Sequence, residues 1–172
     1  MSKNTTKFSH APCYESHKPL KILNGYVYGG NCGEVPPDMA MYIALDSGQA
    51  KNITKKGKAH YVLLNAKNGG VPNINNLLKV LIKASELLEQ GKSIHVGCIG
   101  GHGRTGLVLA AMVAFIMDEA DPITYVRDNY CKKAVETDAQ VKYLNNHFNT
   151  PMAVPYYQIK SDTKVGNIFE VL

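Results

Sequence analysis

The sequence lacks a hydrophobic run long enough to cross a membrane: its longest apolar stretch is residues 107–117, and a span needs about 20 residues. Residues 1–9 are polar and contain no apolar core, so no signal peptide is visible. Cysteine is scarce, and the four cysteines form no paired zinc-binding pattern: Cys13, Cys32, Cys98 and Cys131. We therefore expect a cytoplasmic protein with no membrane partner, whose reduced thiols remain available for chemistry.

The sequence also lacks a stripe of lysine and arginine, although its formal net charge is +5. A mild positive charge suits an anionic ligand such as a phosphate ester, but it does not favour nucleic acid. The 172 residues are 45% hydrophobic and 19% charged, which is typical of a soluble globular protein with a real core. This composition excludes an intrinsically disordered chain.

Apolar runs and turn signals predict one α/β domain over residues 20–149. Short apolar runs bounded by glycine or polar residues predict strands at 21–28, 39–45, 60–64 and 93–96. Helical periodicity and capping signals predict helices at 73–90, 105–117, 122–130 and after Thr137, where Gln140 completes a capping box. Residues 1–19 are expected to form an irregular arm, and residues 150–172 a tail that packs on the domain or mediates association.

The most informative segment lies between the strand at 93–96 and the apolar helix that follows. Here five residues separate Cys98 from Arg104, and three of them are glycines. Glycines let the backbone curl so that successive N–H groups point inward and form an anion-binding nest. The backbone N–H groups expected to bind phosphate are those of Ile99, Gly100, Gly101, His102, Gly103 and Arg104.

Each side chain at the ends of this loop has a role in phosphoryl transfer to sulfur. The positive N-terminus of the following helix favours a thiolate at Cys98 and attracts phosphate. The Arg104 guanidinium can bind two phosphate oxygens bidentately and cannot lose its proton. A hydroxyl at Thr105 can donate to the Cys98 sulfur and assist its departure. The loop therefore predicts a phosphate-binding site with Cys98 as nucleophile.

The run CIGGHGRTG resembles the Cys-x5-Arg-Ser/Thr signature of the protein tyrosine and dual-specificity phosphatase superfamily, and the resemblance spans about residues 20–148. It implies a single α/β domain with a central, mostly parallel sheet flanked by helices. It also implies a phosphatase that works through a phosphocysteine intermediate without a cofactor. In this family a glutamine orients the hydrolytic water, and the resemblance assigns that role to Gln140. Its capping-box position equally explains why a glutamine is there.

Two positions depart from the family pattern. The histidine that usually precedes the nucleophile directly is displaced to His95, which either reaches the loop or packs in the core. The general acid of the family is an Asp before a Gly-x-Pro loop, and the matching residue here is Asn68. An amide cannot protonate a leaving oxygen. The acid is then supplied by another carboxyl, is unneeded for a good leaving group, or is lost; the candidates are Asp46, Asp38 and Glu34.

Other interpretations of the loop are weaker. Residues 101–106 match the dinucleotide pattern G-x-G-x-x-G, but no second strand ending in an acidic residue follows the helix. A metal site formed by His95, Cys98 and His102 would leave the glycines unexplained, and Arg104 would repel a cation, so we expect no metal. The main alternative is a pseudophosphatase that binds phosphorylated ligands without efficient turnover. A singly phosphorylated protein or small phosphate ester is the expected substrate, and a nucleotide or RNA 5′ end stays open.

Overall fold

Five strands form one sheet in the computed structural model, which describes residues 17–30, 36–52 and 59–159. The strands, in chain order, are β1 (Leu20–Ile22), β2 (Gly25–Gly30), β3 (Met41–Ala44), β4 (His60–Leu63) and β5 (Ser93–Gly97). Their order across the sheet is β1-β2-β5-β3-β4, with only the β1–β2 pair antiparallel. This confirms the expected α/β domain with a central, mostly parallel sheet.

The expected strand at 21–28 is instead a hairpin. Residues Ile22 and Gly25 pair directly across a two-residue turn, in which Leu23 has a φ of 56°. Leucine does not signal a left-handed turn, but the dipeptide Asn24-Gly25 that follows it is a turn signal. The turn is held from outside, because the backbone N–H of Asn24 donates to the Leu88 carbonyl at 3.2 Å. The hairpin places β2 beside β5 and extends the sheet by one strand.

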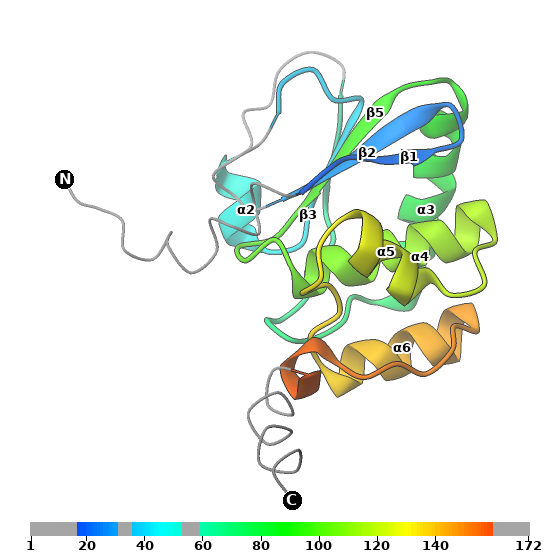
Figure 1. The fold of residues 1–172 in the computed structure, drawn as a ribbon. Coiled ribbons are helices and arrows are strands. Elements are labelled where there is room, and N and C mark those ends of the chain that lie inside the picture. Colours follow the sequence, from blue (N-terminus) through cyan, green and yellow to red (C-terminus); the bar gives the residue numbers. More distant parts are fainter. Residues whose placement is uncertain (1–16, 31–35, 53–58, 160–172) are drawn as a thin grey trace, which may run out of the picture.

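The helices are layered mainly on one side of the sheet (Figure 1). Their bounds are α2 (Ser47–Asn52), α3 (Ile74–Glu89), α4 (Gly103–Met117), α5 (Pro122–Asn129) and α6 (Asp138–Phe148). Helices α3 and α4 contact the sheet, whereas α5 and α6 pack on α4, which places α4 at the centre of the fold. Every residue of α4 from Gly103 to Val113 is buried.

The capping signals place the helix starts as expected. Asn73 and Asp121 each accept an N–H of the first turn of the helix that follows, and Pro122 opens α5. At α6 both halves of the Thr137–Gln140 capping box are present. Helix α2 was not expected, because its six residues carry no apolar periodicity.

The sheet core is asymmetric. All four residues of β3 are buried, since it lies between β5 and β4, whereas edge strand β4 is largely exposed. The apolar run at 60–64, which in the sequence is typical of a buried strand, thus forms the expected strand but at an exposed edge of the sheet. In the described ranges 17–30, 36–52 and 59–159, no helix has the length and apolar character that a membrane crossing needs.

Candidate active site

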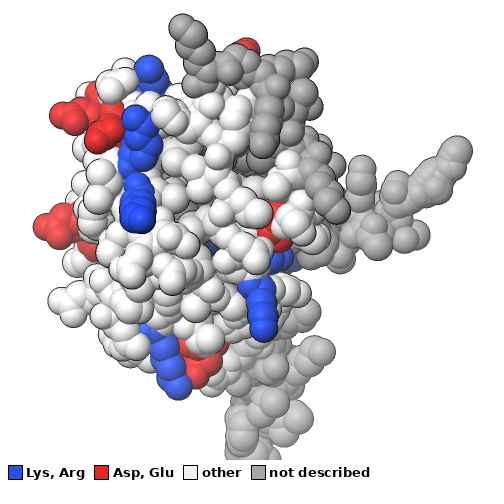
Figure 2. All heavy atoms as spheres, turned by 180° about the vertical axis from the view of Figure 1, so that it is seen from behind, with Lys and Arg blue, Asp and Glu red and all other residues white. Residues whose placement is uncertain are grey.

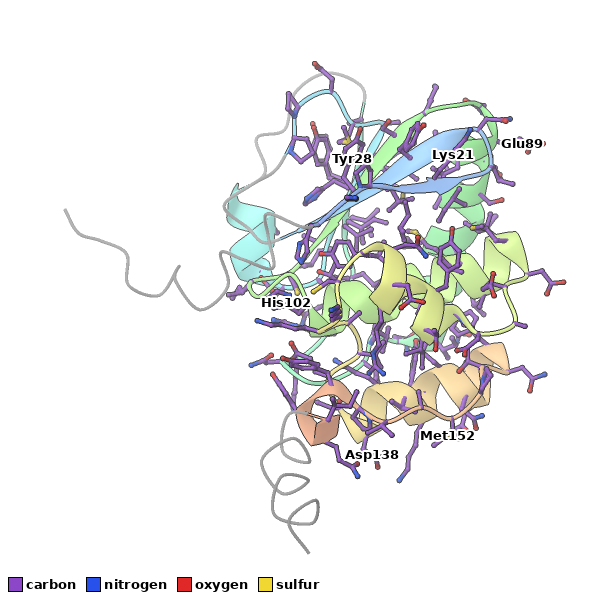
Figure 3. All side chains as sticks on the ribbon, viewed as in Figure 1. Lys21, Tyr28, Glu89, His102, Asp138 and Met152 are labelled. Carbon is purple, nitrogen blue, oxygen red and sulfur yellow. The ribbon has the colours of Figure 1, made fainter. Side chains whose placement is uncertain are left out.

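The Cys98–Thr105 loop lies where the parallel strands β3 and β5 end. Ala44 pairs with Gly97 in the sheet, so the residues that follow these strands meet at one edge: Asp46 after β3 and Cys98 after β5. Gly101 has a φ of 74°, a left-handed conformation that glycine adopts without strain and that curls the loop. Figure 3 labels His102 at the passage from this loop into α4.

The Cys98 sulfur lies at the base of the loop and is 2% exposed. It accepts two hydrogen bonds, from the backbone N–H of Gly101 at 3.2 Å and from the Thr105 hydroxyl at 3.1 Å. Thr105 is fully buried in the first turn of α4, whose N-terminus faces the loop. Both donors and the positive end of the helix dipole therefore lie at the sulfur that the sequence predicts as the nucleophile.

The Arg104 guanidinium is fixed by two buried oxygens. Its Nη1 lies 3.3 Å from Asp46 Oδ2 and donates to the Ala66 carbonyl at 2.9 Å. The same Asp46 oxygen accepts the backbone N–H of Ile99 at 2.8 Å. Asp46 thus joins both ends of the loop. The N–H of Ile99, expected to point at phosphate, donates to Asp46 instead, because a carboxylate is a strong acceptor at this position.

Aromatic and polar side chains support the loop from behind. The Tyr130 hydroxyl donates to the Gly101 carbonyl at 2.6 Å, and the ring centroid of His17 lies 4.3 Å from that of Tyr130. The Nδ1 atom of His102 is 3.4 Å from Cys131 Sγ. Ligand atoms of His17, His102 and Cys131 lie within 4.8 Å of one another. The His95, Cys98 and His102 grouping considered in the sequence is not the group that the fold assembles.

Asn68 lies in an exposed turn at the side of the loop. The turn is closed by the Gly70 N–H, which donates to the Lys67 carbonyl at 2.7 Å. It packs on the start of α6, where the Thr137 hydroxyl donates to the Gly69 carbonyl at 2.7 Å. The match of Asn68 to the acid position of the family stays a prediction.

Of the carboxyls considered as replacements, the structure describes Asp46 and Asp38, and neither is placed to act as the acid. Asp46 is buried and already engaged by Arg104 and Ile99. Asp38 is exposed before β3, at the end of that strand remote from Cys98. Glu34 lies outside the described residues.

Gln140 is fully buried, and both ends of its side chain are bonded to backbone. Oε1 accepts the N–H groups of Glu136 at 2.8 Å and Thr137 at 3.2 Å, while Nε2 donates to the Gly70 carbonyl at 3.2 Å. Gln140 therefore joins the turn of Asn68 to the start of α6. Its role in placing water stays a prediction.

His95 is a packed core residue of β5. Its side chain is buried, and neither ring nitrogen has a hydrogen-bond partner among the described parts of the chain. Burial lowers the pKa of His95 from 6.5 to about 4, because the charged imidazolium would lose its hydration there. Of the two interpretations left open by the sequence, the structure shows core packing.

Solved structures resemble this fold closely. Tk-PTP in its active form has a TM-score of 0.61 at 20% identity, over 79% of this chain and 98% of that one. PTPMT1 in complex with PI(5)P has a TM-score of 0.62 at 15% identity, over 76% and 94% of the two chains. Kinase associated phosphatase has a TM-score of 0.56 at 12% identity, over 79% and 98%. The chain has the protein tyrosine phosphatase fold.

Sequence relatives cover less of the chain than these phosphatase structures do. Two uncharacterized proteins of Methanocaldococcus jannaschii are each 39% identical over 75 residues, 44% of this chain and 50% and 46% of theirs. Cyclin-dependent kinase inhibitor 3 of Rattus norvegicus is 28% identical over 81 residues, 45% of this chain and 38% of its own length. The chain thus matches half or less of the length of these relatives. No protein-family profile matches it.

Two residues at this phosphatase-like loop were not singled out from the sequence. Glu136 is 8% exposed, and its carboxylate packs against Gly103, where an added Cβ would lie 2.8 Å from both Cδ and Oε2. The Tyr157 hydroxyl hydrogen-bonds this carboxylate. Glu136 belongs to the same segment as Gln140 and could have been noted as a carboxyl there. Tyr157 carried no signal, because its position depends on how the tail returns to the domain.

Proposed function

We propose that this protein is a phosphate monoester hydrolase that acts through a phosphocysteine intermediate at Cys98, of the protein tyrosine or dual-specificity type. The observation that carries the proposal is the environment of the Cys98 sulfur, which accepts from Gly101 N–H and Thr105 hydroxyl inside a loop closed by Arg104. A buried cysteine with no chemical role needs neither donors aimed at its sulfur nor a buried arginine beside it.

The first step is attack of the thiolate on phosphorus. A bond forms between Cys98 Sγ and phosphorus as the bond from phosphorus to the leaving oxygen breaks, and that oxygen takes a proton. Arg104 and the N–H groups of residues 100–104 bind the equatorial oxygens and stabilise the charge of the transition state. Asp46 makes this possible by holding the guanidinium in place before the substrate arrives.

The second step is hydrolysis of the phosphocysteine. Water attacks phosphorus, the sulfur–phosphorus bond breaks, and inorganic phosphate leaves after the water has given up a proton. The Thr105 hydroxyl, 3.1 Å from the sulfur, stabilises the departing thiolate. No metal or organic cofactor takes part in either step.

The substrate is proposed to be a singly phosphorylated protein or a small phosphate ester. No lysine stands between Cys98 and Arg104, whereas inositide-directed relatives tend to carry lysines there. Basic side chains on the face shown in Figure 2 form separate groups rather than one continuous stripe. Both observations favour one phosphate as the recognised charge, over a polyphosphorylated lipid or a nucleic acid backbone.

The proposal is tested by assaying hydrolysis of p-nitrophenyl phosphate by the wild type and by Cys98→Ser. We expect turnover in the wild type and its loss in Cys98→Ser, because serine at this position is not ionised near neutral pH. Turnover that survives Cys98→Ser would contradict the mechanism.

A second candidate function is a pseudophosphatase that binds phosphorylated ligands, and the exposed amide of Asn68 at the acid position favours it. The variant Asn68→Asp distinguishes the two. A wild type without turnover that gains activity in Asn68→Asp supports the binding protein, whereas a wild type that is already active supports the enzyme.

A further inference from the structure

We propose that Glu136 is the general acid of this site and donates a proton to the leaving oxygen. This inference rests on the proposed phosphatase function and deepens it, since Asn68 cannot supply that proton. Among the described residues, the carboxylates nearest the loop are Asp46 and Glu136, and Asp46 is engaged by Arg104.

The first support is where Glu136 lies. Its carboxylate packs on Gly103 of the phosphate loop. A Cβ added at Gly103 would lie 2.8 Å from Oε2 of Glu136. Its neighbour Thr137 bonds the Gly69 carbonyl, so Glu136 also adjoins the turn of Asn68. The carboxyl thus packs on the phosphate loop, and its neighbour in sequence holds the turn that contains Asn68.

The second support is that the backbone around Glu136 is held firmly. Gln140 Oε1 accepts its N–H at 2.8 Å, and the Tyr157 N–H donates to its carbonyl at 3.0 Å. Arg127 donates to the carbonyls of Ala134 and Val135 at 2.9 Å each. Catalytic groups need this kind of fixed support to keep their geometry.

The third support is backbone strain next to Glu136. Val135 has a φ of 61°, which is an outlier for a β-branched residue, and its side chain is fully buried. The strained residue directly precedes Glu136 in the sequence.

The fourth support is the setting of Tyr157. The hydrogen bond to Glu136, then burial and the negative charges of Glu136 and Cys98, raise the pKa of Tyr157 to about 12, and Arg104 opposes them. The charges of the nucleophile and of the arginine thus act on the same hydroxyl as the carboxylate of Glu136.

In the reaction, Glu136 acts as a neutral carboxyl in the first step. As the phosphorus–oxygen bond breaks, the Oε–H proton passes to the leaving oxygen, and the carboxylate remains, hydrogen-bonded by Tyr157. The carboxylate regains a proton from solvent before the next turnover, and the water that attacks phosphorus in the second step gives its proton to solvent.

The experiment compares kcat of wild type and Glu136→Gln on two substrates. Phenyl phosphate has a basic leaving oxygen that needs a proton, whereas 2,4-dinitrophenyl phosphate has one that leaves as an anion. We expect Glu136→Gln to lower kcat on phenyl phosphate by about 100-fold or more and to change it little on the dinitrophenyl ester. Glu136→Asp, which keeps a carboxyl on a shorter chain, should retain more activity on phenyl phosphate than Glu136→Gln.

Asp138→Asn is the matched control. Asp138, labelled in Figure 3 at the beginning of α6, is exposed and paired with Lys142 at 3.0 Å. The variant Asp138→Asn removes a carboxylate two residues from Glu136 and should leave kcat on both substrates unchanged. Inhibition by vanadate, compared in all variants, reports whether the phosphate loop is intact.

Equal losses on both substrates, or no loss on either, would overturn the role of Glu136 while leaving the phosphatase proposal standing. If Glu136→Gln folds poorly, the ratio of the two kcat values in Glu136→Asp decides, since a structural role would leave that ratio at the wild-type value. A wild type that hydrolyses neither ester would remove the phosphatase proposal and the acid role together. The two failures are therefore distinguishable.

Discussion

Gly103→Ala should separate catalysis from stability at this site. An added Cβ would lie 2.8 Å from the Cδ and Oε2 atoms of Glu136 and 3.0 Å from its Cγ. Carbon atoms do not approach so closely, so the carboxylate has to move. It is the end of a flexible side chain, and it can swing away without displacing backbone.

The expected magnitudes follow from this geometry. Alanine in place of glycine restricts the unfolded chain and contributes about 0.4–1 kcal/mol, which partly offsets the weakened hydrogen bond from Tyr157. The net change in the free energy of unfolding should stay within about 1 kcal/mol. In Gly106→Ala, by contrast, the added Cβ would meet the Ala134 Cα at 2.7 Å, so backbone must shift at about 1–3 kcal/mol.

Gly103→Ala should change the activity much more than it changes the stability. With the carboxyl displaced, hydrolysis of phenyl phosphate should fall towards the level of Glu136→Gln, about 100-fold, while the dinitrophenyl ester is hydrolysed nearly as before. Urea unfolding and the two kcat values measure both effects on one preparation. Unchanged hydrolysis of phenyl phosphate, or an equal loss on both esters, would refute the reasoning.

Two further predictions concern buried charge. His95 has a pKa of about 4 when folded and 6.5 when unfolded, so its contribution to stability is complete above pH 6.5 and is lost as pH falls to 4. The pKa difference of about 2.5 corresponds to about 3 kcal/mol of stability. Urea unfolding from pH 7 to pH 4 measures this loss, and His95→Phe should remove it. The same pH dependence in wild type and His95→Phe would contradict the role of His95. Asp46→Asn leaves the buried Arg104 without its carboxylate and should lower stability by about 3–5 kcal/mol. Inorganic phosphate at saturation should raise the stability of this variant; a variant that phosphate does not stabilise would contradict phosphate binding at Arg104.

The phosphate loop was predictable because its residues are close in sequence. Cys98, Gly101 and Thr105 meet within eight positions, and a strand before and a helix after them fix their geometry. The spacing of glycines and the arginine carries physical meaning without any knowledge of distant contacts. The capping box of Thr137 and Gln140 and the helix starts were predictable too, because they depend on residues that are close in sequence.

The rest of the site depends on contacts between distant segments. Asp46 reaches Ile99 across 53 positions, and Tyr130 reaches Gly101 across 29. Nothing in the local pattern of Asp46 distinguishes a loop-fixing carboxylate from an acid, and only the role of an acid was considered. The hairpin turn at Leu23 was missed although Asn24-Gly25 marks it, because the apolar run on both sides of the turn reads as one continuous strand.

The most direct test of the central claim is to trap the covalent intermediate. Wild-type protein mixed with 2,4-dinitrophenyl phosphate and quenched rapidly in acid should carry a phosphoryl group, which mass spectrometry of the digested protein should place on Cys98. Cys98→Ser should carry none. A wild type that turns over the ester without any phosphorylated protein, or with the phosphoryl group on another residue, would contradict the account.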